Sequence, residues 1–226
     1  MESSEQLNLF SDTSSLLSLD NSNHAKSSNL IKNGEQLLIE QGEIIYYSNF
    51  FDQPTSDFLY QELEKKIKWS QEYFKIYGKS IALPRLTAWY GEPEKRYTYS
   101  NIEMNPHPWI EPLLFMKKEI ELVAKVKFNS VLLNFYRDGN DGVAWHSDDE
   151  KELGESPVIG SVSLGGIRRF MLKPKNKESN QKYEIELADG SFLLMSGETQ
   201  KYWLHQIPKT KKQVKPRINL TFRIIH

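Results

Sequence analysis

Hydrophobic and polar residues follow two different spacings along the chain, and the spacing changes near Phe128. Before that point, two stretches carry apolar residues every three to four positions, which predicts amphipathic helices. The first helix is expected to begin at Asp52 and Pro54 and to bury Phe58, Leu59, Leu63 and Ile67. The second is expected to begin between Pro106 and Pro112 and to bury Ile110, Leu113, Leu114, Ile120 and Val123.

Short strand-like runs make up most of the remaining chain. They are expected at 37–39, 44–47, 130–137, 158–164, 169–173, 183–187, 191–195 and 217–225, and the aromatic segment 73–99 is strand-like with a turn at Gly78. Many short strands separated by turn residues predict a sandwich or a barrel. We therefore expect a mainly β fold with flanking helices, of the α+β class, whose strands form a double-stranded β-helix (jelly roll).

The first 34 residues differ from the rest, because they are rich in Ser, Asn and Asp and have few large apolar residues after Leu19. Such a segment cannot bury enough apolar surface to offset its ordering entropy. We therefore expect a disordered tail at 1–34 and one folded domain at 35–226. Within the tail, QLNLF (Gln6–Phe10) resembles the peptide with which bacterial repair proteins dock on the sliding clamp, although a chance apolar cluster is the alternative.

Composition limits the classes of protein to consider. The 226 residues include 29 Lys and Arg against 30 Asp and Glu, a net charge of −1, so any basic surface for nucleic acid must be local. The chain has no cysteine, which excludes disulfides, thiolate metal ligands and cysteine nucleophiles. The chain lacks a signal-peptide pattern and a long apolar run, so we expect a soluble protein without membrane contact. We expect it to act as a monomer in the cytoplasm, or in the nucleus if the source is eukaryotic.

The stretch NFYRDGNDGVAWHSDDE, residues 134–150, contains His146 and Asp148 two positions apart. Alternate side chains of an extended backbone leave the same face, so this imidazole and carboxylate can converge. His205, in a second strand-like region, is the candidate for a third ligand. Two imidazoles and one carboxylate leave open positions on a metal, as in non-haem Fe(II) oxygenases. Taken alone, the H-x-D pattern with a distant histidine also occurs by chance.

The last strand-like run, RINLTFRII, has a polar face and an apolar face. The polar face carries Arg217, Asn219, Thr221 and Arg223, and the apolar face carries Ile218, Leu220, Phe222 and Ile224. Two guanidinium groups that face into a barrel need anions, and a dicarboxylate such as 2-oxoglutarate satisfies both. The alternative is a pair of surface arginines on an exposed strand face.

Together these motifs resemble the AlkB family of Fe(II)/2-oxoglutarate dioxygenases, in particular the branch that repairs alkylated bases in duplex DNA. The resemblance covers roughly Tyr73 to the C-terminus and is carried by NFYRDGNDGVAWHSDDE, SPVIGSVSLGGIRRF, GSFLLMSGETQKYWLHQIPK and PRINLTFRII. It implies that His146, Asp148 and His205 bind Fe(II). It also implies that 2-oxoglutarate is held by Asn134, Tyr136, Arg217, Asn219, Thr221 and Arg223.

The resemblance also implies a substrate side of the site. A base in a duplex must be flipped out before it is oxidised, and a wedge fills the space that it leaves. The segment 73–99 is then a nucleotide-recognition lid, with a finger hairpin at Tyr77, Gly78 and Lys79 and a base pocket lined by Tyr97, Thr98 and Tyr99. Tyr77 is the candidate wedge, where the family's duplex repair enzymes have phenylalanine. Tyr99 would stack on the flipped base opposite His146.

Acidic and basic residues complete the implied nucleic-acid site. Asp149 and Glu150 would read the exocyclic amine of the base or complement the positive charge of an N-methylated base. The candidates for phosphate contacts are Lys209, Lys211, Lys212, Lys215, Arg168 and Arg169. The alternative is that the two tyrosines of the pocket are ordinary aromatic residues of a strand and that the charged residues lie in solvent-exposed loops, without a role in binding.

The activity implied by the resemblance is oxidative demethylation of N1-methyladenine and N3-methylcytosine in DNA. O2-dependent decarboxylation of 2-oxoglutarate would be coupled to hydroxylation of the N-methyl group, followed by release of formaldehyde. An RNA or tRNA demethylase with the same chemistry, a non-catalytic nucleic-acid-binding module and a protein hydroxylase are the alternatives.

Overall fold

The computed structural model describes residues 34–226, except 77, 94–96, 100–101, 105 and 180, and it describes no side chains at 75–77 or 94–105. The expected tail, with its Gln6–Phe10 peptide, therefore lies outside the described residues up to Asn33. The unit described below is Gly34–His226. None of the helices in this part of the chain has the length and apolar character needed to cross a bilayer.

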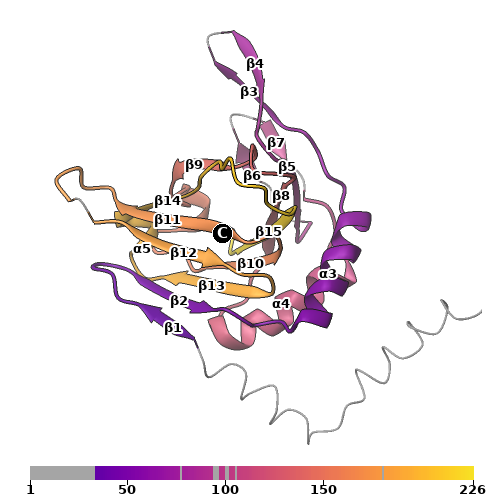
Figure 1. Ribbon diagram of the computed structural model, residues 1–226, viewed down its shortest axis with the longest axis horizontal. Coiled ribbons are helices and arrows are strands. Elements are labelled where there is room, and N and C mark those ends of the chain that lie inside the picture. The colour runs from indigo at the N-terminus through magenta and orange to yellow at the C-terminus, as the bar shows by residue number, and fades with distance from the viewer. Residues whose placement is uncertain (1–33, 77, 94–96, 100–101, 105, 180) are drawn as a thin grey trace, which may run out of the picture. The chain divides into compact units, whose positions relative to one another are not determined.

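Two antiparallel sheets face each other and form the jelly roll (Figure 1). The seven-stranded sheet has the order β1 (Glu35–Leu37), β2 (Glu43–Tyr47), β13 (Ser191–Ser196), β10 (Ile159–Gly165), β15 (Arg217–Arg223), β8 (Ser130–Tyr136) and β5 (Leu86–Gly91). The four-stranded sheet has the order β12 (Tyr183–Leu187), β11 (Arg168–Pro174), β14 (Trp203–Ile207) and β9 (Val143–His146). The predicted mainly β fold with flanking helices is confirmed.

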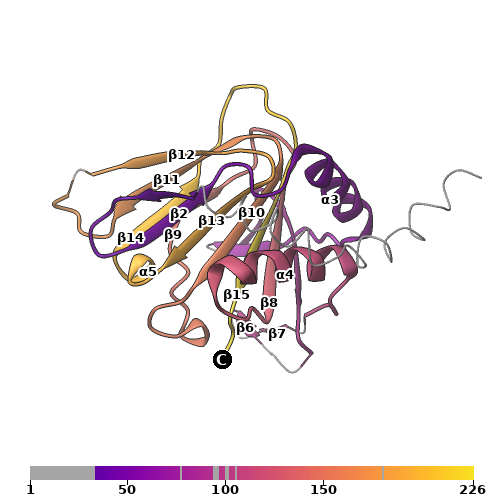
Figure 2. The ribbon, with the colours of Figure 1, turned by 90° about the horizontal axis from the view of Figure 1, so that it is seen from below.

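Two long helices, α3 (Gln53–Lys66) and α4 (Glu111–Ala124), cover the outer face of the seven-stranded sheet (Figure 2). Asp52 caps α3 as predicted, and its carboxylate accepts a hydrogen bond from Thr55 N at 3.0 Å. The predicted buried faces were wrong at Phe58 and Leu114, which are 44% and 40% exposed. Each is the sequence neighbour of a fully buried leucine, Leu59 after Phe58 and Leu113 before Leu114, and a rotation of about 100° per residue carries it to the edge of the buried face.

Strand β15 divides the core into two parts. Ile218, Leu220 and Phe222 are fully buried in an apolar cluster with residues of α3 and α4. Side chains of the opposite parity point between the two sheets, where a second apolar cluster joins β10 and β13 to β11 and β14. Because this interior also receives Arg217, Asn219 and Thr221, a polar site forms inside an otherwise apolar barrel.

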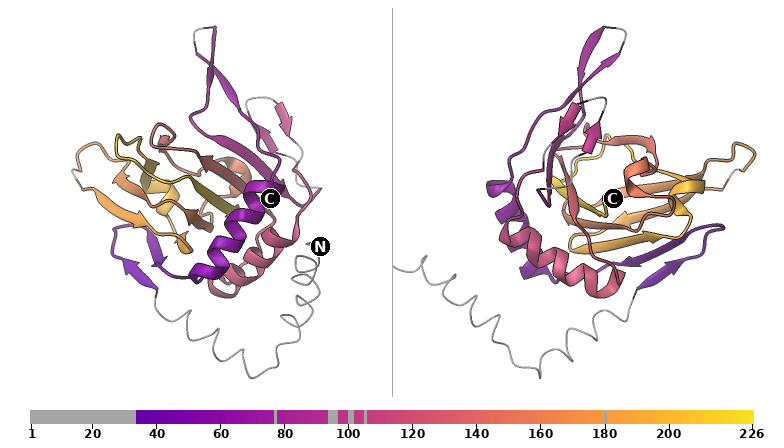
Figure 3. Two further views of the ribbon diagram at one scale, coloured as in Figure 1. Left: turned by 45° about the vertical axis from the view of Figure 1, so that its right-hand side comes forward. Right: turned by 180° about the vertical axis from the view of Figure 1, so that it is seen from behind.

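A hairpin of β3 (Tyr73–Ile76) and β4 (Lys79–Ala82) projects from the body of the protein (Figure 3). Gly78, directly before β4, has φ +76°, a left-handed conformation that glycine adopts without steric cost. Tyr73 and Ile81 on its strands are 62% and 41% exposed. Beside it lies a second short hairpin of β6 (Tyr97–Tyr99) and β7 (Ile102–Met104).

Glu121, in the last turns of α4, is a buried carboxylate with three donors. It is 7% exposed and accepts from Phe128 N at 2.9 Å, from Lys117 Nζ at 2.9 Å and from Lys127 Nζ at 2.8 Å. Burial by itself would raise the pKa of Glu121, but these donors outweigh it and lower the pKa below its ordinary value. The ionised carboxylate therefore stabilises the fold above its unfolded-state pKa, and this contribution is lost as pH falls through the folded-state pKa.

We expect Glu121→Gln to lower the free energy of unfolding by about 1–3 kcal/mol at pH 7, because buried donors lose an ionised acceptor. Urea unfolding at pH 7 and pH 3 measures this, and the difference from wild type should shrink at pH 3. Glu198→Gln is the matched control, since Glu198 and Lys201 form an exposed pair at 2.8 Å whose loss should change stability less than the loss of the Glu121 carboxylate. Equal destabilisation by Glu121→Gln at both pH values would show that ionisation of Glu121 contributes nothing.

Candidate metal and cosubstrate site

Strand pairing brings the three predicted metal ligands together. His146 ends β9, as the sequence pattern required, and pairs directly with His205 in β14. The two imidazole rings have centroids 4.2 Å apart. Asp148 follows in the loop after β9, and the ligand atoms of all three residues lie within 4.8 Å of one another.

Neighbouring groups orient each of these ligands. The Nδ1 atom of His146 lies 2.8 Å from the carbonyl oxygen of Ala144, which can only accept, so Nδ1 carries the proton and Nε2 is free for a metal. His205 is 6% exposed, and its ring stacks on Phe170 at 5.3 Å. Burial lowers the pKa of His205 to about 3, so the imidazole is neutral at pH 7, as a metal ligand must be.

Asp148 supplies the negative charge of the site. Its Oδ1 atom accepts from Arg223 Nη2 at 2.6 Å, while its Oδ2 atom lies 4.0 Å from His205 Nε2. Burial by itself would raise the pKa of Asp148, but the nearby charge of Arg223 outweighs it and keeps the pKa low. Two imidazoles and one carboxylate on one side of a small space fit Fe(II), with open positions left for other ligands.

Arg217 forms the deep end of the interior. It is 1% exposed, its Nη2 atom donates to Ser163 Oγ at 2.9 Å, and its guanidinium carbon lies 5.2 Å from the centre of the Tyr136 ring. Burial lowers the pKa of Arg217 to about 10, so it remains charged at pH 7. Its Nε and Nη1 atoms have no hydrogen-bond partner among the described residues. A buried cation with free donors is costly unless an anion binds to it, so this end of the site fits the distal carboxylate of 2-oxoglutarate.

The other predicted cosubstrate residues line the same interior. Tyr136 and Asn134 on β8 pair with Arg217 and Asn219 on β15, and Arg223 lies at the metal end of that strand. Asn219 Nδ2 donates to Ser161 Oγ at 2.8 Å, and Thr221 Oγ1 donates to Asn219 Oδ1 at 3.3 Å. Arg223 Nε, like the two Arg217 atoms, is buried without a partner in the described part of the chain. Free donors at both ends of β15 match the two ends of a dicarboxylate.

Several residues of this site were missed by the sequence reasoning. Ser161 and Ser163 alternate in GSVSLG on β10 and hold Asn219 and Arg217, so strand alternation was a signal that could have found them. Arg85, just before β5, donates from Nε to Asn134 Oδ1 at 2.7 Å. Gln200 contacts the backbone of Asp148, and no local pattern pointed to it.

The structure describes part of the predicted substrate side. Gly78 and Lys79 lie at the tip of the projecting hairpin, whereas Tyr77 lies outside the described residues. Tyr97, Thr98 and Tyr99 form β6, and their side chains also lie outside the description. Beside the metal ligands, Asp149 forms an ion pair with Lys175 at 2.7 Å. Glu150 has a buried Oε2 atom with no partner among the described residues, so it retains an acceptor for a ligand.

The predicted phosphate contact at Arg168 was wrong. Arg168 is 3% exposed, and its guanidinium donates to the carbonyl oxygens of Asp138, Asp141 and Pro208 at 3.2, 2.8 and 2.7 Å. These carbonyls belong to the loop after β8 and the loop after β14. Arg168 therefore joins two loops inside the protein, while Arg169 is exposed and pairs with Glu184 at 3.4 Å.

Comparison with known proteins agrees with this geometry. Residues 43–223 match the family described as the 2OG-Fe(II) oxygenase superfamily. The chain is 41% identical over 191 residues to alpha-ketoglutarate-dependent dioxygenase alkB homolog 3 of Mus musculus, covering 81% of this chain and 66% of that protein. It is 36% identical over 192 residues to DNA oxidative demethylase ALKBH2 of Homo sapiens, covering 79% of this chain and 72% of that protein. The chain belongs to the AlkB family of 2OG-Fe(II) oxygenases.

A solved AlkB-family structure shares the fold. The structure of OsALKBH1 superposes with a TM-score of 0.61 at 16% identity, covering 84% of this chain and 100% of that one. This chain spans 64–66% of the length of the alkB homolog 3 proteins that it matches. The family's cofactor and cosubstrates are Fe(II), 2-oxoglutarate and O2, in agreement with the fit of the site to a metal and a dicarboxylate.

Each residue of this AlkB-family site has a distinct role in the expected chemistry. His146, Asp148 and His205 would hold Fe(II), which supplies oxidising chemistry with O2 and 2-oxoglutarate when bound. Arg217 would bind and orient the distal carboxylate of 2-oxoglutarate, and the hydrogen bond to Ser163 holds its guanidinium in place. Arg223 neutralises Asp148 on the side away from His205. The apolar side chains around His205 and Tyr136 would limit the access of water to the reacting groups.

Proposed function

We propose that this protein is an oxidative demethylase that repairs N1-methyladenine and N3-methylcytosine in DNA, coupling 2-oxoglutarate decarboxylation to hydroxylation of the N-methyl group and release of formaldehyde. One observation carries the proposal: the same interior contains the His146–Asp148–His205 cluster and the buried donors of Arg217 that have no partner among the described residues. Relatives named as DNA oxidative demethylases support the choice of substrate.

The acidic residue Glu150 supports a cationic base as the substrate. It follows the metal ligand Asp148 by two residues, and its buried Oε2 atom is unpaired among the described residues. Methylation at N1 of adenine or N3 of cytosine adds positive charge and blocks pairing, so such bases are easier to flip out of a duplex. The exposed apolar residues of the projecting hairpin suit a finger that enters the duplex, with Tyr77 proposed as its wedge and Tyr97 and Tyr99 as the base pocket.

The test is mass spectrometry of a DNA oligonucleotide with one N1-methyladenine. The protein is loaded with Fe(II) and 2-oxoglutarate without oxygen, and air is then admitted. The proposal predicts the loss of one methyl group and the formation of succinate. Consumption of 2-oxoglutarate with an untouched DNA oligonucleotide would overturn the DNA substrate, and a matched RNA oligonucleotide then tests an RNA demethylase. No change in either would contradict the catalytic assignment itself.

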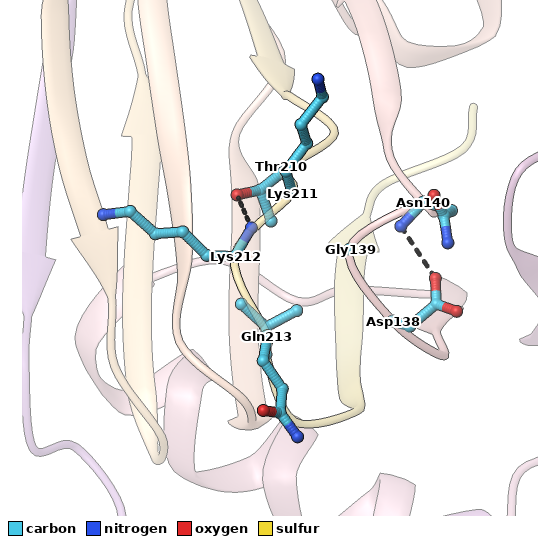
Figure 4. Close-up of a pocket in the computed structure, with 8 residues that line it drawn as sticks. Asp138, Gly139, Asn140, Thr210, Lys211, Lys212 and Gln213 are labelled. Atoms are coloured by element: carbon cyan, nitrogen blue, oxygen red, sulfur yellow. Dashed lines mark hydrogen bonds between the residues drawn. The ribbon is translucent and has the colours of Figure 1, made fainter.

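We propose that the loop between β14 and β15 contacts the phosphates of the nucleic acid. This loop carries Lys209, Lys211, Lys212 and Lys215. Thr210 N donates to Gly139 O at 2.8 Å, and Lys212 N donates to Thr210 Oγ1 at 3.1 Å, which fixes the loop against the loop after β8. Lys211 and Lys212 line a hollow between these loops (Figure 4). A fixed backbone that carries several cationic side chains suits contacts that position rather than specify.

We expect the double variant Lys211→Ser, Lys212→Ser to bind DNA more weakly and to reduce the slope of log affinity against log salt by about 2, because each phosphate contact releases a counterion. Fluorescence anisotropy with a labelled duplex from 50 to 200 mM salt measures the slope. The double variant Lys65→Ser, Lys118→Ser, at two exposed lysines of α3 and α4, is the control for loss of two positive charges. An unchanged slope in the double variant would remove this loop from the DNA interface.

We also propose the partners expected from the sequence: alkylated DNA, and a bacterial sliding clamp bound through Gln6–Phe10. The protein is proposed to act as a monomer where DNA is found, in the cytoplasm or in a eukaryotic nucleus. Replacing Leu9 and Phe10 with alanine tests the clamp contact, since both supply the apolar anchors of the peptide. Unchanged affinity for a purified clamp would rule the contact out.

A further inference from the structure

A buried glutamine contacts the backbone of the central metal ligand. Gln200 lies in the one-turn helix α5 (Thr199–Tyr202) and is 1% exposed. Its side-chain oxygen Oε1 accepts a hydrogen bond from Asp148 N at 3.0 Å, and its Nε2 atom lies 3.5 Å from Met195 Sδ. Both ends of the carboxamide are therefore engaged inside the protein, and only one orientation of the amide places the oxygen on the Asp148 N–H.

The helix that carries Gln200 is fixed to the seven-stranded sheet. Thr199 is 1% exposed, and its Oγ1 atom accepts from Glu43 N at 2.9 Å and donates to Ser196 O at 2.6 Å. Glu43 begins β2 and Ser196 ends β13, two neighbouring strands of the large sheet. Asp148, in contrast, follows β9 of the small sheet. Gln200 thus connects the loop of one sheet to a rigid support on the other.

We propose that Gln200 is a positioning residue for the metal site, an inference that rests on the proposed function. Gln200 holds the backbone of Asp148 while Arg223 holds its Oδ1 atom at 2.6 Å, and these two contacts determine where Oδ2 lies relative to His205 and His146. Two fixed points on one short residue leave its carboxylate little rotational freedom. Partners of this kind outside the ligand set typically change metal affinity by 10- to 100-fold when they are removed.

The same contact affects the residues that follow Asp148. Asp149 is tied to Lys175 at 2.7 Å, and Leu153, two residues beyond Lys151, is buried in the inter-sheet cluster. Glu150 lies between these anchors. Fixing the Asp148 backbone therefore also fixes the direction in which Glu150 leaves the loop, so Gln200 couples the metal ligand to the proposed base-reading carboxylate.

The test compares Mn(II) affinity in three variants, with Mn(II) used as a redox-stable replacement for Fe(II). Gln200→Leu keeps the side-chain size but removes the acceptor, and we expect Mn(II) affinity to fall about 10-fold. Gln200→Glu keeps an oxygen acceptor at the same place and should stay within about threefold of wild type. Met195→Leu removes only the sulfur contact of Gln200 and should bind Mn(II) like wild type. Titration calorimetry gives the affinities, and the electron paramagnetic resonance spectrum of bound Mn(II) reports the ligand geometry.

Melting temperatures separate positioning from stability. All titrations are run well below the melting temperature of each variant, where a purely structural role of Gln200 would leave the Mn(II) affinity and spectrum unchanged. Wild-type affinity in Gln200→Leu, even with a lowered melting temperature, would overturn the inference while leaving the proposed function intact. Failure of the wild-type protein to bind Mn(II) would overturn the metal site and the inference together.

Discussion

Arg217→Met is expected to abolish measurable 2-oxoglutarate turnover and to weaken 2-oxoglutarate binding by roughly 30- to 5,000-fold. This range corresponds to the loss of one partner of a buried charge pair, about 2–5 kcal/mol. Arg217 is 1% exposed and has two donors, Nε and Nη1, that no described residue accepts from, so a bound carboxylate would satisfy both. Titration calorimetry with Mn(II)-loaded protein measures the affinity directly.

The same variant should not destabilise the protein without cosubstrate. A buried, incompletely paired cation costs free energy that a methionine of similar length avoids. We therefore expect Arg217→Met to melt at or above the wild-type temperature. Addition of 2-oxoglutarate to the Mn(II)-loaded proteins should raise the melting temperature of the wild type but not that of Arg217→Met. Arg169→Met, at an exposed arginine that pairs with Glu184, is the control and should keep the full ligand-induced shift. A normal shift in Arg217→Met would show that the cosubstrate carboxylate binds elsewhere.

His205→Ala is expected to weaken metal binding by more than about 100-fold, beyond the 10- to 100-fold effect of losing a partner outside the ligand set. His205 is 6% exposed, neutral at pH 7 and paired with His146 across two strands. Its removal leaves two ligands, which cannot define one side of an octahedral ion. Mn(II) titration followed by succinate analysis after Fe(II) loading measures both consequences.

His107→Ala is the matched histidine control. His107 lies outside the metal site, with its ring 5.2 Å from Tyr90, and its backbone pairs with β5. This variant should bind Mn(II) with wild-type affinity. If His205→Ala bound Mn(II) as tightly as His107→Ala, the three-residue cluster would not be the metal site, whatever the activity of the wild-type protein.

Local patterns along the chain were sufficient to predict the faces of single elements. Alternation along RINLTFRII separated Arg217 and Arg223 from the apolar residues between them, and the structure places those apolar residues against the helices. The Asp52–Pro54 signal fixed the start of α3. These predictions succeeded because the period of a strand or helix depends on backbone geometry alone. The errors at Phe58 and Leu114 arose where a residue lies at the edge of a face, and neighbouring elements decide its exposure.

Partners far apart in the sequence were decided by the tertiary structure. The ligand types at His146, Asp148 and His205 were visible in the sequence, but their convergence depends on the register between β9 and β14. Arg168 resembled its exposed neighbour Arg169, yet strand parity turned it inward to three backbone carbonyls. Gln200 and Ser163 acquired their roles through packing of the two sheets. Sequence periodicity therefore determined which side chains share a face of an element, whereas strand register and sheet packing, which depend on burial over the whole domain, decided which of those side chains meet.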